Sequence, residues 1–265
     1  MIANVLTIAG TDPTGGAGIQ ADLKTFSALG AYGMSVITAV VAQNTHGVRR
    51  FVPLAPSFVA EQIEAVFDDV RVDAVKIGMV ANAGIVEVIA RCLQARADCP
   101  VVLDPVMVAK SGDRLVDPEA VAAIRERLIP LSTLITPNLP EAGVLMQGEE
   151  PRSLQAMRVA VTEMGQLGAD WVLLKGGHLE GLRSVDLLAS KGHTLELDAP
   201  RIATRNSHGT GCTLSAAITA LLPGSTMTLA VSGAKEYLTA ALGAADQLQV
   251  GGGYGPVHHF HALWK

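Results

Sequence analysis

The sequence predicts a three-layer α/β fold, in which helices cover both faces of a mostly parallel β-sheet. Short apolar runs alternate with amphipathic helical patterns along the 265 residues, as they do in successive βαβ units. The chain is 49% hydrophobic but only 4% aromatic, and this composition suits parallel strands buried on both faces. Because no internal repeat, low-complexity tract or Pro/Ser-rich linker interrupts the pattern, we expect a single domain over residues 1–265.

The expected elements follow one another in a regular order. Apolar runs predict strands over Val5–Ala9, Ser35–Ala42, Val75–Met79, Val101–Asp104, Thr133–Thr136 and Trp171–Lys175. Amphipathic stretches between them predict helices over Ile19–Leu29, Ser57–Val70, Ala83–Gln94, Pro118–Leu128 and Leu154–Leu167. The last third predicts a hairpin, Ser184–Ala189 with Thr194–Leu197, and two long helices, Gly211–Leu221 and Met227–Leu248. Ligands of such sheets bind outside the carboxyl ends of the strands, so functional residues are expected there.

Composition and charge exclude several classes of protein. The formal net charge is −5 with acids and bases interspersed, so we expect neither a nucleic-acid-binding face nor a charged tail. No apolar run approaches the ~18 residues of a membrane span, and Met1–Ala9 lacks the basic start of a signal peptide. The cysteines Cys92, Cys99 and Cys212 are too few, and odd in number, for a disulfide framework. We therefore expect a cytoplasmic enzyme.

A glycine-rich turn, residues 10–18 (GTDPTGGAG), joins the first strand to the first helix. It is not a P-loop, because no Lys-Ser/Thr pair follows Gly15. Residues 16–21 match the G-x-G-x-x-A pattern of dinucleotide-binding folds, but the acid expected about 20 residues later is missing between Asp22 and Glu61. The glycines favour close approach of a ligand to the backbone, although a turn that only needs small residues would have the same sequence.

A second glycine-rich segment, residues 206–215 (NSHGTGCTLS), precedes a strongly helical run. Gly209, Thr210 and Gly211 would present consecutive backbone N–H groups at a helix N-terminus, which forms an anion site. Such a site suits the charge on a transferring phosphoryl group. Cys212 would lie in the first helical turn, where the helix dipole favours a thiolate. A glycine cap beside a small buried cysteine remains an equally good interpretation of the segment alone.

The motifs taken in order resemble one family of kinases. They are TIAGTDPTGGAG at 7–18, KIGM at 76–79, LDPV at 103–106, ITPNLPEA at 135–142, KGGH at 175–178, HGTGCTLS at 208–215 and GPVHHFH at 255–261. This order resembles the hydroxymethylpyrimidine/phosphomethylpyrimidine kinases of thiamine biosynthesis, members of the ribokinase-like superfamily. Most of that superfamily has Asp at the position of Cys212, whereas the pyrimidine kinases have Cys. The resemblance implies a ribokinase-like fold, with Cys212 accepting or orienting the proton of the substrate hydroxyl.

The resemblance also implies the reaction and its participants. ATP, bound with Mg²⁺, would phosphorylate 4-amino-5-hydroxymethyl-2-methylpyrimidine and then its monophosphate, giving the pyrophosphate. Gln43, at the end of an apolar strand, would recognise the aminopyrimidine, since its amide offers a donor beside an acceptor. Gly10, Asp22 and Met79 are expected in the same pocket, although Asp22 could equally be a carboxylate on a helix surface. Residues 110–112 (Lys-Ser-Gly) are expected to form a lid.

Residues for the phosphates and the metal are implied in the same way. Asn138 and Glu141 would organise Mg²⁺ and its waters, and one carboxylate with an amide suits Mg²⁺ better than Zn²⁺. Their Asn-x-x-Glu spacing, with Pro140 between them, is also that of a helix capping box, and both interpretations can hold. Asp104 would add negative charge near the metal. Lys175, at the carboxyl end of a strand, would neutralise ATP phosphates.

Two other functions stay open. A pyridoxal-type vitamin kinase would use the same fold, because pyridoxal is also a flat heterocycle with a hydroxymethyl group. A pyrimidine-binding sensor without catalysis would not need the anion segment or Lys175, and their presence favours an enzyme. His258, His259 and His261 lack nearby Cys or carboxylate residues and predict a packed C-terminal segment rather than a metal site. We also expect a homodimer.

Overall fold

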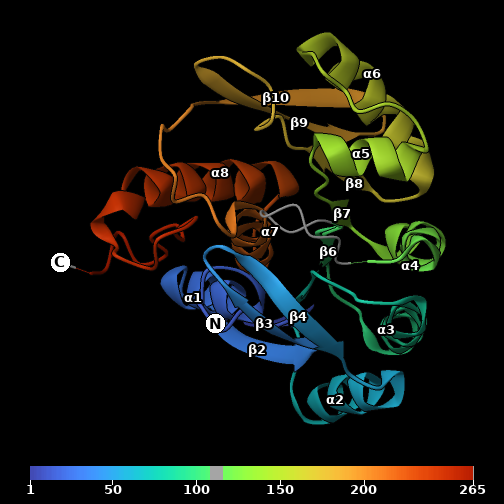
Figure 1. The fold of residues 1–265 in the computed structure, drawn as a ribbon. Helices are drawn as coiled ribbons and strands as arrows, with labels where there is room; N and C mark the ends of the chain where they lie inside the picture. The colour runs from blue at the N-terminus through green and yellow to red at the C-terminus, as the bar shows by residue number, and fades with distance from the viewer. Residues whose placement is uncertain (108–115, 265) are drawn as a thin grey trace.

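The computed structural model describes residues 1–107 and 116–264 and confirms the three-layer architecture (Figure 1). Its central strands run parallel to one another: β1 (Asn4–Ala9), β2 (Tyr32–Ile37), β5 (Ala74–Ile77), β6 (Val101–Leu103), β7 (Leu134–Ile135) and β8 (Trp171–Leu174). The predicted hairpin, β9 (Arg183–Ser190) and β10 (His193–Pro200), extends the sheet in antiparallel fashion beyond β8. The order across the sheet is β10-β9-β8-β7-β6-β5-β1-β2.

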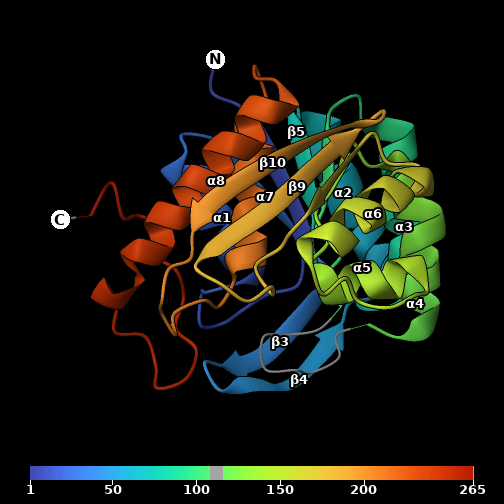
Figure 2. The same ribbon diagram turned by 90° about the horizontal axis from the view of Figure 1, so that it is seen from above.

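Helices cover both faces of this sheet (Figures 1 and 2). One face carries α1 (Gly18–Ala28), α7 (Thr210–Leu221) and α8 (Met227–Gly243). The other carries α2 (Pro56–Asp69), α3 (Ala83–Arg96), α4 (Pro118–Ala123), α5 (Leu139–Met146) and α6 (Leu154–Met164). Short π or 3₁₀ turns lie at Ile124–Leu128, Ile129–Leu131, Gly165–Leu167 and Ala245–Gln247. No helix in the described ranges is long and apolar enough to cross a membrane.

The expected strand Ser35–Ala42 is wrong as a single element. β2 ends at Ile37, and the chain then enters β3 (Ala39–Asn44), which pairs with β4 (Gly47–Pro53) in a separate two-stranded sheet. Thr38 lies at the junction, where its N–H donates to Ala9 O at 3.0 Å and its hydroxyl donates to Met79 O at 2.7 Å. These partners come from β1 and from the segment that follows β5, so the apolar run alone gives no sign of the break. Figure 2 shows β3 and β4 set apart from the main sheet.

The packing of α7 brings its N-terminal end to the carboxyl ends of the strands. The side of α7 that faces α1 carries small side chains, since Ala216 and Ala220 pack there with Phe26. Leu214 and Ile218 join an apolar cluster shared with β6, β7 and α8. Because small residues allow α7 to lie close to the sheet, polar groups in its first turns reach the strand ends. Ser215, for example, donates a hydrogen bond to Asp104, which directly follows β6.

Candidate active site

The two glycine-rich segments of the sequence lie against each other. Gly209 is the N-cap of α7 and has a φ of 76°, a conformation that favours glycine. A Cβ at this position would overlap the carbonyl oxygen of Gly16 in the first segment. Gly209 therefore permits backbone-to-backbone contact between the two turns. The lack of a side chain at Gly209 is required by this packing, whereas Gly211 has different neighbours.

Gly211 instead faces charged groups. A Cβ there would lie 3.3 Å from Lys175 Nζ and 3.6 Å from Asp104 Oδ2. α7 begins at Thr210, so the free N–H groups of its first turn and the Lys175 ammonium lie at one place. Such a place suits an anion, because backbone donors, the helix dipole and a cation act together. Of the expected phosphate-binding residues, Thr210, Gly211, Lys175 and Asn138 all line one cavity of about 560 Å³.

That cavity is lined by apolar as well as polar side chains. It lies between α7, α8 and the segment that follows β10, and its apolar lining includes Leu182, Ile202, Leu214, Leu238 and Leu242. Its volume falls within the ~300–1,000 Å³ typical of small-ligand pockets. The arrangement can hold a molecule with a flat apolar part and a charged tail.

Asp104 is held by three neighbours and is almost fully buried. Its carboxylate accepts hydrogen bonds from Thr136 Oγ1 at 3.2 Å and Ser215 Oγ at 3.2 Å, and it lies 3.1 Å from Lys175 Nζ. Burial by itself would raise the pKa of Asp104, but the Lys175 and Lys76 ammonium groups outweigh it and lower the pKa. Asp104 is thus a charged partner that orients Lys175 toward Gly211.

Asn138 and Glu141 form the capping box of α5. The Glu141 N–H donates to Asn138 Oδ1 at 2.9 Å, and the Asn138 N–H donates to Glu141 Oε2 at 2.8 Å. The capping interpretation of this pair is confirmed, while its role with Mg²⁺ stays a prediction. Burial raises the pKa of Glu141 to about 7, although Lys175 opposes the shift. Neutralisation by a metal would remove part of this burial cost.

Mg²⁺ would depend here on few protein ligands. No group of three or more His, Cys, Asp or Glu residues in the described part of the chain could hold a metal by itself. The oxygens of Asp104 and Glu141 already accept hydrogen bonds from the protein. Mg²⁺ keeps several waters and is commonly bound through one or two carboxylates together with substrate phosphates. The donor set therefore fits Mg²⁺ carried in with a nucleotide.

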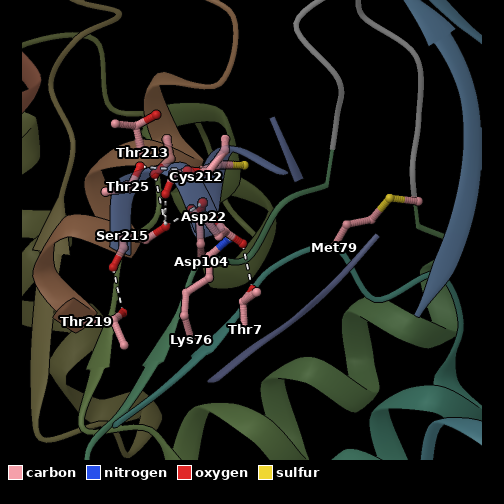
Figure 3. Close-up of polar contacts among 12 residues, drawn as sticks. Thr7, Asp22, Thr25, Lys76, Met79, Asp104, Cys212, Thr213, Ser215 and Thr219 are labelled. Atoms are coloured by element: carbon pink, nitrogen blue, oxygen red, sulfur yellow. Dashed lines mark hydrogen bonds and ion pairs between the residues drawn. The ribbon is translucent and has the colours of Figure 1, made fainter. Parts of the chain in front are cut away.

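Cys212 is half-buried in the first turn of α7. Burial raises the pKa of its thiol to about 11, with Lys76 acting in the opposite direction and Asp22 and Asp104 adding to the rise. A hydrogen bond from the Gly18 N–H also favours the thiolate. Loss of solvent thus raises the pKa of Cys212 by more than the helix dipole lowers it, and Cys212 carries its proton at neutral pH. Figure 3 shows Cys212 in one cluster with Asp22, Lys76 and Asp104.

The alternative that Asp22 is a carboxylate on a helix surface is wrong, while its role in substrate binding stays a prediction. Its side chain is fully buried, and its two oxygens lie 3.0 and 2.9 Å from Lys76 Nζ (Figure 3). Thr7 Oγ1 donates a further hydrogen bond to Asp22 at 2.6 Å. Asp22 therefore lies beneath the site as the partner of Lys76, on the inner side of α1. Lys76 itself was missed, although a lysine inside the apolar run of a central strand is a usable signal.

Asp12 is a second residue that sequence reasoning missed. One oxygen accepts from the N–H and hydroxyl of Thr14, both at 2.8 Å, and the other accepts from the Ala17 N–H at 2.8 Å. The second oxygen also lies 2.7 Å from His208 Nε2, so Asp12 joins the two glycine-rich segments. Burial would raise the pKa of Asp12, but hydrogen bonds from His208, Gln43 and Thr14 lower it strongly. The Asp-x-Thr spacing after a strand, typical of an Asx turn, is the signal that could have found it.

The remaining residues expected at the pyrimidine lie around the first glycine segment. A Cβ on Gly10 would lie 3.1 Å from Met79 Sδ and 3.6 Å from Ala39 O, so Gly10 and Met79 are neighbours. Gln43, at the end of β3, hydrogen-bonds Asp12 in the same turn. The structure thus brings Gly10, Met79 and Gln43 to one region. The expected lid at residues 110–112 lies outside the described residues.

Comparison with known proteins identifies the family of this chain. The family model of phosphomethylpyrimidine kinase matches residues 12–258. The chain is 56% identical over 262 residues to the hydroxymethylpyrimidine/phosphomethylpyrimidine kinase of Escherichia coli (strain K12), with 98% of each protein covered. A crystal structure of phosphomethylpyrimidine kinase from Clostridium difficile has a TM-score of 0.80 at 46% identity, covering 91% of this chain and 99% of that one. Bacillus subtilis pyridoxal kinase, solved as an ADP complex, has a TM-score of 0.92 at 37% identity, with 99% of each chain covered. This chain belongs to the phosphomethylpyrimidine kinase family.

Proposed function

We propose that this protein transfers the γ-phosphate of ATP to 4-amino-5-hydroxymethyl-2-methylpyrimidine and then to the resulting monophosphate, in thiamine biosynthesis. The observation that carries the proposal is the position of Gly211. It lies beside both Lys175 and Asp104 at the N-terminal end of α7, next to Cys212. Backbone donors and a cation stabilise the charge on a transferring phosphoryl group, and a side chain beside them can orient the alcohol and accept its proton. The pyrimidine kinases among its relatives supply the identity of the alcohol.

The residues divide the work of this reaction among them. The substrate hydroxyl oxygen forms a bond to the γ-phosphorus, the bond from that phosphorus to the β,γ-bridging oxygen breaks, and ADP leaves. The N–H groups of residues 209–211 and the Lys175 ammonium stabilise charge on the oxygens of the transferring group. Mg²⁺, when bound, neutralises charge on the phosphates. Cys212 orients the hydroxyl as a thiol, and its minor thiolate form accepts the proton.

The nucleotide would lie in the cavity of about 560 Å³. The apolar lining residues Ile202, Leu238 and Leu242 suit a purine ring, and Lys175, which lies beside Gly211, suits the phosphates. The pyrimidine would lie on the other side of the γ-phosphate, near Gly10, Met79 and Gln43. Binding of a nucleotide together with an alcohol is supported by pyridoxal kinase structures from Staphylococcus aureus, one solved with ADP and another with AMP-PCP and pyridoxal, whose TM-scores are both 0.91.

The test is mass spectrometry of the products formed from the pyrimidine alcohol with Mg-ATP. We expect the monophosphate first and the pyrophosphate later. Pyridoxal is the second arm, because kinases of this alcohol share the fold closely. A protein that phosphorylates pyridoxal but leaves the pyrimidine untouched would contradict the proposal. Gly211→Val supplies a control for contaminating kinases, since its side chain would enter the anion site.

Two further expectations belong to this proposal. A homodimer is supported by Val40 and Val52, which face each other across β3 and β4 and are 51% and 49% exposed. Sedimentation of the wild type and of Val52→Lys tests it, with a monomeric variant expected. A reducing, cytoplasmic setting is supported by Cys92, Cys99 and Cys212, all of which are free thiols in the structure.

A further inference from the structure

The C-terminal histidine motif forms part of a segment that the proposed reaction leaves unexplained. We call residues 251–259 the C-terminal strap; it follows α8 and belongs to the red end of the chain in Figure 1. Residues 255–259 are all buried, and Val257 has no exposed surface. Such burial is unusual for an irregular segment close to a chain end. What the strap contacts therefore indicates what it does.

The strap first contacts the turn that follows Gln43. The Tyr254 N–H donates to Thr45 O at 2.8 Å, and the Gly253 N–H donates to Thr45 Oγ1 at 3.1 Å. A Cβ on Gly253 would overlap Thr45 O, so the two backbones pack directly. Thr45 lies two residues after Gln43 in the turn between β3 and β4. The strap thus holds the hairpin that carries the residue expected to recognise the pyrimidine.

The strap next contacts both glycine-rich segments. The His208 N–H donates to Gly255 O at 3.0 Å. A Cβ on Gly16 would lie 2.6 Å from the His208 ring and 3.1 Å from Pro256 Cβ, so the three residues are in close contact. The anion-binding turn and the first glycine segment are therefore packed against the same stretch of backbone as the Gln43 hairpin.

Its last contact reaches the first turn of α7. His259 is 4% exposed, and its Nε2 lies 3.1 Å from the hydroxyl of the fully buried Thr213. The backbone of His259 is held by α8, because the Tyr237 hydroxyl donates to His259 O at 2.6 Å. Burial lowers the pKa of His259 to about 3, so the ring is neutral at physiological pH. Thr213 directly follows Cys212, and its N–H donates to Gly209 O at 2.8 Å.

We propose that His259 is a positioning residue for phosphoryl transfer, acting through Thr213 on the turn of α7 that carries Gly211 and Cys212. The C-terminal strap is the element that sets this turn against the Gln43 hairpin. The inference rests on the proposed kinase activity. Because a displacement of about 1 Å can cost up to ~10²-fold in rate, loss of the contact should lower kcat by about tenfold. None of the described residues that line the cavity belongs to the strap, so the Michaelis constant for ATP should change little.

The experiment compares single and paired variants in the full-length protein. His259→Leu removes the ring nitrogen, Thr213→Val replaces the hydroxyl by a methyl group of similar size, and the double variant removes both. His259→Gln keeps an amide that can bond Thr213. His261→Leu is the matched control, since His261 lies two residues away, packs its ring on Tyr237 and, within the described ranges, makes no hydrogen bond to α7. Each is assayed for kcat, both Michaelis constants, the melting temperature and hydrogen exchange in residues 208–214.

We expect kcat to fall about tenfold in His259→Leu and in Thr213→Val, and no further in the double variant, because both changes remove one contact. His259→Gln should recover most of the rate, and exchange in residues 208–214 should quicken in His259→Leu but not in His261→Leu. The proposal would be overturned by additive losses of kcat in the double variant or by an equal loss of kcat in His261→Leu. A rise in both Michaelis constants that follows the melting temperature would overturn it as well. The isosteric Thr213→Val decides the matter if His259→Leu fails to fold.

Failure of the proposed function is distinguished by the wild type. A wild-type protein that phosphorylates only pyridoxal refutes the pyrimidine assignment, and the same ratios among variants are then measured with that alcohol. A wild type inactive with both alcohols refutes the kinase activity on which the inference rests.

Discussion

Cys212 should make the first phosphoryl transfer far more dependent on pH than the second. Burial raises the pKa of its thiol to about 11, despite the opposing Lys76 ammonium. If the thiolate accepts the proton of the substrate hydroxyl, only about one molecule in 10⁴ is competent at pH 7. The competent fraction rises tenfold with each pH unit, so the first transfer should quicken about 10²-fold between pH 7 and pH 9.

The second transfer has no such requirement. Its acceptor is a phosphate monoester with a second pKa near ~6, which is already ionised at pH 7. Its rate should therefore stay nearly constant over the same range. Glu141, whose pKa burial raises to about 7, would change both transfers together if it titrates. The ratio of the two rates consequently isolates Cys212.

Substitution sharpens the prediction. Cys212→Ala should slow the first transfer by ~10²–10⁴-fold, the usual contribution of a general base, and should abolish its rise with pH. The second transfer should lose much less. Cys212→Asp, which introduces the residue of most ribokinase-like kinases, should recover part of the first transfer only. Cys92→Ala is the matched control, because Cys92 lies in α3 on the opposite face of the sheet.

The measurement is single-turnover kinetics at saturating Mg-ATP and constant ionic strength, from pH 6.5 to 9, with the alcohol and with its monophosphate. Equal losses on the two acceptors in Cys212→Ala would mean that Cys212 shapes the anion site without handling a proton. A flat profile for the alcohol in the wild type would mean that the thiol only orients the hydroxyl. Either result refutes the role of the thiolate.

Three further predictions separate catalysis, recognition and stability. Gly211→Val should cripple transfer while calorimetry shows nearly unchanged pyrimidine affinity. Gly209→Ala should instead lower the melting temperature, because its Cβ would overlap Gly16 O. A collapse of pyrimidine affinity in Gly211→Val would contradict this division. Gln43→Ala should raise the Michaelis constant for the pyrimidine by the equivalent of roughly 1–3 kcal/mol per unsatisfied group and leave that for ATP unchanged; an unaltered pyrimidine constant would remove Gln43 from the site. Lys76→Met should lower the free energy of unfolding in urea by ~3–5 kcal/mol, because it leaves the Asp22 charge buried and unpaired. Adding Asp22→Asn should restore much of this stability, and no recovery would show that the ion pair is not the cause.

Much of the fold can be predicted from the sequence, because a helix or strand that is buried on one or both faces has a recognisable local pattern of apolar residues. The apolar runs of the parallel strands and the helical stretches between them are of this kind, and they correspond to elements of the structure except Ser35–Ala42, which is divided between β2 and β3. The functional positions at Lys175, Asn138 and Gly211 were also accessible, since parallel strands and glycine-rich helix starts have recognisable sequences. The resemblance to pyrimidine kinases supplied the chemistry that the patterns alone left open.

Only the tertiary structure decided which charges are paired and which groups lose solvent. Asp22 pairs with Lys76, which lies 54 residues further along the chain. His208 and Asp12 meet across 196 residues, and no local pattern records that contact. Cys212 sits in a helix turn that favours a thiolate, yet the elements packed around it raise its pKa. Periodicity reports whether a residue is buried, but partner identity and desolvation arise between segments far apart in the chain, and these determine the chemistry of the site.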